Sequence, residues 1–273
     1  MNTTNDPFLS FIIGVSIGLP LGLSAYKLKY LNARATVASI VFSGLYFMGG
    51  VGLYIASLFF FFSSSLVTRL YYTHKKNRGT AEPEEGRSLS QVLGAGLISA
   101  LFSALYGMFP AYREKTLPAA LAVLTASNAD TWAAELGSFY HNPPRLITRP
   151  WVKVEPGTSG GVTPLGSLGG LLGSILLGLL VFGETQVGLL TLRMSCIPLI
   201  VMLGWLGEII DSIVGATLQI KYYCPRCKVL TDKPVHRCGE ATIHEGGLRI
   251  ISNEATNLIA TGFVGLLALL LAC

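Results

Sequence analysis

The chain has 273 residues, of which 51% are hydrophobic and only 13% are charged, and its mean hydropathy is +0.55. A water-soluble protein normally carries about 25% charged residues, so this composition excludes a soluble globule and indicates a membrane protein. The net charge of +5 does not indicate a nucleic-acid partner, because the lysines and arginines fall between apolar segments. In such loops, basic residues indicate the orientation of the chain in the membrane.

The apolar segments predict an all-α, polytopic membrane helix bundle. A spanning helix needs roughly 20 mostly apolar residues. The segments that meet this requirement are Phe8 to Ala25, Leu89 to Phe109, Leu117 to Gly137, Leu165 to Phe182, Val187 to Ile220 and Ala255 to Ala272. No basic residue precedes the first of them and no small-residue cleavage site follows it, so we expect it to be retained as a helix.

The segment from Thr36 to Val67 is too long for one ordinary span and too short for two full ones. Its middle contains Gly49, Gly50 and Gly52, and glycines of this kind break helices. We therefore expect a hairpin of two shorter helices that enters and leaves on one side. The charged stretch from Lys75 to Arg87 is expected to be a solvated linker.

Basic residues of short loops collect in the cytoplasm, and both flanks of the hairpin are basic. Counting spans onward places two polar loops, Ser138 to Pro164 and the cysteine-containing 221–250, on that same cytoplasmic face. The predicted organisation is one membrane domain, 1–273, with 221–250 as an inserted metal knuckle. The weak points of this topology are Arg113, Lys115 and Arg193, which fall at the opposite face.

Four acidic residues lie near the cytoplasmic ends of two predicted helices. Asp130 and Glu135 belong to one, and Glu208 and Asp211, three residues apart and therefore on one helical face, belong to the other. Acids at such depth generally face a protein interior or a wet cavity. Converging carboxylates suit Mg²⁺ and phosphoryl transfer, whereas the alternative is that they cap helices or pair with Arg145, Arg149 or Lys153.

The loop after the first acidic pair combines basic residues with closely spaced glycines. Glycines let backbone N–H groups approach an anion, and a helix that starts near Leu165 presents its positive end to the same space. The alternative is an ordinary turn. The candidate nucleotide- or phosphate-binding residues are Asn128, Arg145, Lys153, Gly157, Thr158, Ser159 and Gly160.

Cysteine spacing in the last polar loop predicts a small structural zinc site. Three thiolates and one imidazole provide tetrahedral ligands, and the set is Cys224, Cys227, Cys238 and either His236 or His244, of which we favour His236. The alternative is free cytosolic thiols. Asn253 and Asn257 share a face at the start of the last helix and are further candidates for the polar site.

Three segments carry a resemblance to a known family: Ser127 to Gly137, Pro156 to Val162, and Asp211 to Gln219. They resemble the integral membrane family that contains plant phytyl-phosphate kinase and animal transmembrane protein nineteen, and more distantly phytol kinase and dolichol kinase. The resemblance implies CTP as phosphate donor. It implies that Asp130, Glu135, Glu208 and Asp211 hold Mg²⁺.

These observations predict a membrane-embedded kinase that transfers a phosphoryl group to a prenyl phosphate such as phytyl or geranylgeranyl phosphate. The expected partners are the prenyl lipid, the nucleotide and membrane lipid, with no nucleic acid, and a homodimer is left open. One alternative is a kinase for the free prenyl alcohol. Another is an ion-coupled transporter, because broken helices and intramembrane acids also mark carriers.

Overall fold

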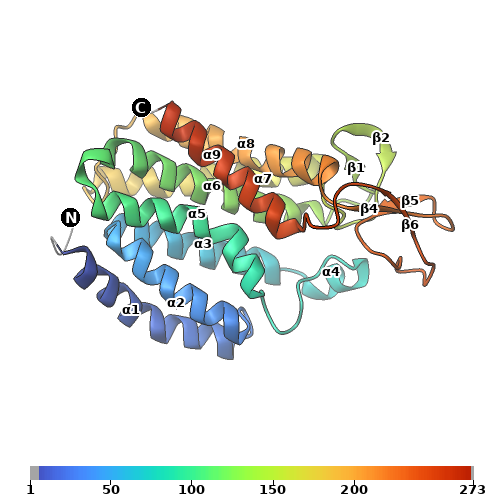
Figure 1. Ribbon diagram of the computed structural model, residues 1–273, viewed down its shortest axis with the longest axis horizontal. Helices are drawn as coiled ribbons and strands as arrows, with labels where there is room; N and C mark the ends of the chain where they lie inside the picture. The colour runs from blue at the N-terminus through green and yellow to red at the C-terminus, as the bar shows by residue number, and fades with distance from the viewer. Residues whose placement is uncertain (1–5, 272–273) are drawn as a thin grey trace.

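The computed structural model describes residues 6–271 and shows a bundle of long helices lying side by side along the long axis of the molecule (Figure 1). The described part contains nine α-helices: α1 (Pro7–Lys27), α2 (Ala33–Met48), α3 (Val51–Arg69), α4 (Tyr72–Arg78), α5 (Leu89–Met108), α6 (Arg113–Gly137), α7 (Pro164–Gln186), α8 (Cys196–Thr217) and α9 (Asn253–Leu270). A 3-10 turn, η1 (Pro110–Tyr112), joins α5 to α6.

Six of the described helices are long and apolar enough to cross a membrane, namely α1, α3, α5, α7, α8 and α9. The predicted polytopic helix bundle is therefore confirmed. One predicted span is shorter than expected. Helix α8 begins only at Cys196, because the chain turns at Gly188, where φ is +74°, and residues 187–195 form a connection.

Helix α6 is long but is absent from this apolar set, although the sequence predicted a span there. Every residue from Thr116 to Ala129 is buried. Five helices contact α6, namely α3, α5, α7, α8 and α9. Its buried side chains therefore face protein and not lipid, so they need not be apolar. The polar content of α6 is thus explained by its central position.

The predicted break in the hairpin is present at Gly49 and Gly50, between α2 and α3. Gly50 has φ +98°, a backbone conformation that other residues rarely adopt, and α3 starts directly after it. Helix α2 has only 16 residues, whereas α3 has 19 and is long enough to span by itself. The second limb of the hairpin is therefore longer than the sequence predicted.

Both long polar loops lie at one end of the bundle, together with α4 (Figure 1, right). The first loop forms an antiparallel sheet of order β2-β1-β3, from β1 (Arg145–Leu146), β2 (Arg149–Lys153) and β3 (Gly161–Val162). The second forms a sheet of order β5-β4-β6, from β4 (Lys221–Cys224), β5 (Val229–Thr231) and β6 (Ile243–Gly246). A bridge between Val154 and Leu230 connects the two loops. We call this the loop end of the bundle.

Candidate active site

A polar cavity of about 350 Å³ lies at the loop end, between α6, α7, α8 and the two loops. We call it the acidic cavity. Its lining includes all four predicted carboxylates and the segment Pro156 to Thr163, which we call the glycine-rich loop. Further lining residues are Arg78, Thr80, Glu82, Ser138, Ser167, Ser212, Gln219, Asp232 and Asn253. The structure thus brings together acidic and glycine-rich segments that are separated by many residues in the sequence.

Close packing of α6 against α8 brings their acids together. A Cβ atom added at Gly207 would lie 2.5 Å from the Cβ of Ala126, and one at Gly204 would collide with Thr125. Small residues at these positions therefore let the helix backbones approach. As a result Asp130 of α6 interacts electrostatically with both Glu208 and Asp211 of α8.

Two of these acids differ in how their oxygens are used. Asn257 of α9, with its amide nitrogen turned towards Asp211, donates to Oδ1 at 2.9 Å. Glu208 is 4% exposed, and its Oε2 has no hydrogen-bond partner among the described residues. Ser159 Oγ and Gln219 Oε1 in the same lining are likewise buried without a partner in the described chain. Buried polar atoms are nearly always bonded, so these atoms are suited to a bound ligand, cation or water.

Glu135 is held by an interaction that the sequence analysis missed. Lys75 of α4 is fully buried, and its Nζ lies 2.5 Å from Oε2 of Glu135. The same Nζ donates to the carbonyl oxygens of Val67 and Thr68 at the end of α3. The stretch from Lys75 to Arg87 was expected to be a solvated linker, so that expectation is wrong at Lys75. A helix as short as α4 gives no periodic signal in the sequence.

The glycine-rich loop curves around the acidic cavity because two of its glycines adopt positive φ. Gly157 has φ +86° and Gly160 has φ +76°. Gly160 packs so closely against α8 that an added Cβ would lie 2.5 Å from the backbone nitrogen of Ala216. Thr163 then caps α7 by accepting a hydrogen bond from the Gly166 nitrogen at 3.0 Å. The loop and the positive end of α7 therefore face the same cavity as the acids.

The remaining predicted phosphate-binding residues lie elsewhere. Asn128 is buried inside the bundle, accepts from Ser63 at 2.9 Å and donates to the carbonyl of Gly173 at 2.8 Å. Arg145 and Lys153 are exposed on β1 and β2 and are not part of the cavity lining. Apart from Lys75, which is paired with Glu135, the cationic side chains near the acids are Arg78, which lines the cavity, and Arg87, which interacts electrostatically with Asp130.

The second loop contains a metal-binding cluster. Ligand atoms of Cys224, Cys227, His236 and Cys238 all lie within 4.8 Å of one another, a spacing that suits a tetrahedral ion such as zinc. We call these four residues the metal knuckle. His244, the alternative ligand, lies instead in β6 against the ring of Tyr222.

Hydrogen bonding within the metal knuckle shifts the pKa values of its thiols. The contact with His236 lowers the pKa of the Cys238 thiol to about 6. The contact with Cys238 raises the pKa of Cys227 to about 11. Thiolates are the metal-binding form, and a bound cation would favour that form for all three cysteines.

The metal knuckle is joined to the glycine-rich loop through side chains. Glu155, directly before that loop, accepts a hydrogen bond from Thr231 at 2.5 Å and lies 3.5 Å from Nε2 of His236. Asp232, whose other oxygen pairs with Lys221 at 2.6 Å, accepts a hydrogen bond from the backbone nitrogen of Ser159 at 2.7 Å. Burial lowers the pKa of Lys221 and raises that of Asp232, and their close contact opposes both shifts.

The fold and the site define a multi-pass integral membrane protein with an acid-lined cavity and a metal knuckle at one end. The chain belongs to the family described as Integral membrane protein DUF92, which it matches over residues 16–265.

Several proteins are similar to the chain along much or all of its length. Protein PGR of Arabidopsis thaliana is 29% identical over 93% of both chains. Uncharacterized membrane protein MJ0933 of Methanocaldococcus jannaschii is 31% identical over 99% of this chain and 98% of its own. Uncharacterized membrane protein sll0875 of Synechocystis sp. is 31% identical over 62% of this chain and 64% of its own. No solved structure matches the chain significantly.

Proposed function

We propose that this protein is a membrane-embedded phosphotransferase that moves the terminal phosphoryl group of a nucleoside triphosphate, with CTP as first candidate, onto a prenyl phosphate. One observation carries the proposal. Asp130, Glu208 and Asp211 come from two helices and line one cavity together with the glycine-rich loop and the first turn of α7. Carboxylates that share a cavity with a helix N-terminus are an arrangement suited to a metal-bound polyphosphate.

The carboxylates of the acidic cavity suit an open magnesium site. Glu208 Oε2 is buried and has no hydrogen-bond partner among the described residues, so a carboxylate oxygen is available to a cation. Mg²⁺ is usually bound by one or two carboxylates, several waters and substrate phosphates, not by a closed protein cage. Asp130, Glu208 and Asp211 would hold it, and it would supply charge neutralisation of the phosphates.

The reaction needs little further chemistry from the protein. The bond between the terminal phosphorus and its bridging oxygen breaks, a bond to an oxygen of the prenyl phosphate forms, and the nucleoside diphosphate leaves. A phosphate acceptor that is already ionised needs no general base. The contribution of the chain is to orient both substrates, with Arg78 and Arg87 offsetting the charge of two anions.

The proposal places the loop end in the cytosol, where the nucleotide is available. The basic flanks of the hairpin lie at the loop end, as the preference of basic loops for the cytoplasm requires. A carrier is less consistent with this arrangement. Carrier sites lie near the middle of the bilayer, whereas the acidic cavity is lined by loops at one end of the bundle.

The test is a transfer assay in detergent with Mg²⁺, γ-labelled CTP and geranylgeranyl phosphate or geranylgeraniol in parallel. We expect labelled diphosphate, and an about 10²- to 10³-fold loss of rate in Asp130→Asn. Glu114→Gln changes an exposed carboxylate at the far end of the same helix and is the matched control. Labelled monophosphate from the alcohol alone would support the alcohol kinase. Full activity of Asp130→Asn, or ion flux in liposomes without transfer, would overturn the proposal.

A further inference from the structure

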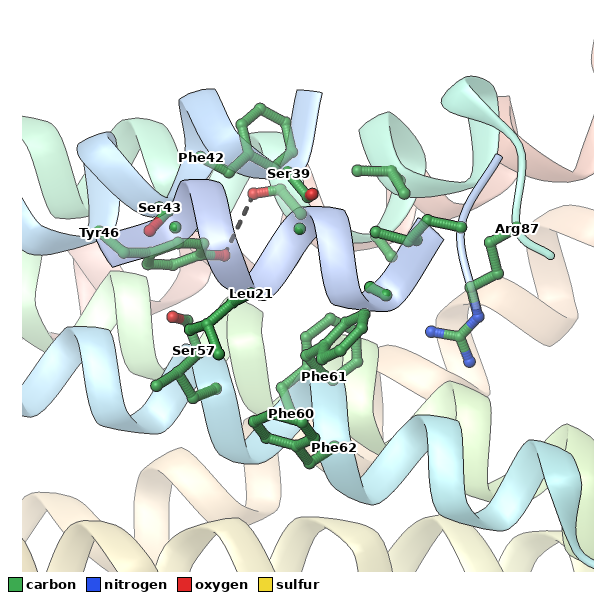
Figure 2. A pocket seen from close by; sticks show the side chains of 18 of the residues that line it. Leu21, Ser39, Phe42, Ser43, Tyr46, Ser57, Phe60, Phe61, Phe62 and Arg87 are labelled. Carbon is green, nitrogen blue, oxygen red and sulfur yellow. Dashed lines mark hydrogen bonds between the residues drawn. The ribbon is translucent and has the colours of Figure 1, made fainter. Parts of the chain in front are cut away.

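A second cavity, of about 130 Å³, lies between α1, α2, α3 and α5 (Figure 2). We call it the apolar cavity. Phenylalanines of α3 contribute much of the lining, and residues of α1, α2 and α5 contribute more. The lining includes Leu21, Phe60, Phe61, Phe62, Arg87 and Val92. None of them was singled out as a site residue by the sequence patterns.

The hydroxyl groups of this cavity are already bonded within the protein. Ser39 and Ser57 donate to backbone carbonyls, and Ser43 donates to the carbonyl of Gly14 at 2.7 Å. Tyr46 is bonded to Ser99. A ligand in this cavity therefore meets a hydrocarbon surface with its polar groups satisfied, which suits an apolar chain and not a polar solute.

The apolar cavity is accessible from the side of the bundle. Phe62 is 54% exposed and Leu21 is 37% exposed, although both contribute to the lining. In a membrane, these outward surfaces of α1 and α3 face lipid. A hydrocarbon chain can thus enter from the bilayer without crossing water.

A single cation lies at the end of the cavity away from the serines, as Figure 2 shows for Arg87. Its backbone is fixed by hydrogen bonds with Tyr30 and Asn32 at 3.0 Å each. Its guanidinium donates to Thr68 at 3.1 Å and forms no ion pair with any described residue, so most of its five donors are available. Such a group is well suited to bind a phosphate.

Arg87 lies within electrostatic range of the acidic cavity. It lines the apolar cavity and interacts electrostatically with Asp130, which lines the acidic cavity. An amphiphile with its chain among the phenylalanines and its anionic head at Arg87 would present that head towards the carboxylates. The charge and the apolar surface thus match the two ends of a prenyl phosphate.

The geometry points to the apolar cavity as the binding site for the hydrocarbon chain of the prenyl-phosphate acceptor, with Arg87 as the anchor of its phosphate. This inference rests on the proposed function and assigns the acceptor half of its active site. It also predicts a preference for phosphate over alcohol, because a guanidinium gains little from a neutral hydroxyl.

The primary test is photocrosslinking, which requires no turnover. The probe is geranylgeranyl phosphate with a diazirine at the far end of its chain. We expect labelled peptides from the Phe60 to Phe62 segment, and loss of that label in Val92→Phe, which fills the cavity. Leu101→Phe, on the exposed face of the same helix, should label as the wild type does. Labelling confined to other segments would overturn the inference.

The second test separates the inference from the proposed function. Arg87→Gln should weaken binding of the phosphate probe about tenfold or more and leave binding of geranylgeraniol unchanged. Val92→Ala enlarges the cavity and should shift chain-length preference towards longer prenyl phosphates. This variant keeps the test informative if Val92→Phe fails to fold. Crosslinks at Phe60 to Phe62 without any phosphoryl transfer would support the chain site and overturn the kinase. Phosphoryl transfer with unaltered chain-length preference in both Val92 variants would support the kinase and overturn the chain site.

Discussion

Glu155 and His236 lie side by side, with Oε1 of the first 3.5 Å from Nε2 of the second, although 80 positions separate them in the chain. Glu155 is 5% exposed, and its other oxygen is bonded to Thr231. A carboxylate on the outer nitrogen of a metal-binding histidine fixes the ring and raises its basicity. Because Glu155 also directly precedes the glycine-rich loop, one buried side chain links the metal knuckle to a loop that lines the acidic cavity.

Metal removal should therefore loosen the glycine-rich loop. Purified protein should contain about one zinc per chain, since the cluster offers one tetrahedral site. After chelation, we expect faster hydrogen exchange in residues 156–161 and little change in α5, which is remote from the metal knuckle. Readdition of zinc should reverse the effect. Identical exchange with and without metal would contradict this coupling.

Substitution of Glu155 by glutamine should lower zinc affinity. Loss of an outer partner of a metal ligand typically costs 10- to 100-fold in affinity. The measurement is competition with a chromophoric chelator. Glu245→Gln changes an exposed carboxylate on β6 and serves as the control. Equal affinities of the two variants would show that Glu155 does not support the ligand.

Removal of one partner of the buried ion pair between Lys75 and Glu135 should destabilise the protein strongly. Removal of one partner leaves an uncompensated buried charge, at a cost of about 3–5 kcal/mol. We expect Lys75→Met to unfold at markedly lower temperature in detergent, and Lys75→Met with Glu135→Leu to recover part of the loss. The control is Lys76→Met, because Lys76 pairs with Glu84 on the exposed surface and its removal should change little.

Gly160→Ala should damage the site more than an equivalent substitution elsewhere. The new methyl group would meet the backbone of Ala216 and would also have to accept φ +76°. Gly188→Ala has a similar φ of +74° but open space around it, so it isolates the conformational cost, which is about 1–2 kcal/mol. We expect CTP turnover to fall strongly only in the first variant. Equal losses would show that contact with α8 is unimportant.

Much of the fold was predictable because its signals are local. Apolar windows marked five of the six helices that are apolar enough to span among the described residues, all but α3, and glycines marked the break between α2 and α3. The spacing of Cys224, Cys227 and Cys238 marked the metal knuckle. The structure brings His236, and not His244, close to the three cysteines, and His236 as the fourth ligand stays a prediction.

The rest depends on contacts between distant segments. Lys75 lies in a charged stretch, and only the fold buries it against Glu135. Arg145 and Lys153 are basic residues close in sequence to the glycine-rich loop, but strand pairing directs them to the exterior. Arg87 ends the same charged stretch as Lys75, and only the fold shows that it lies against Tyr30 and Thr68. The acidic residues predicted from the sequence do line one cavity, whereas the predicted basic residues Arg145 and Lys153 do not.

The enclosure of α6 has a consequence for how the protein is made. A helix too polar to partition into lipid by itself cannot be released from the insertion machinery as an independent segment. Its burial by α7, α8 and α9, all later in the chain, means that it is stabilised only once these have been synthesised. A nascent chain that ends before α7 should accordingly leave α6 unintegrated. Membrane integration of the helix that carries Asp130 and Glu135 therefore depends on the synthesis of the helices that follow it.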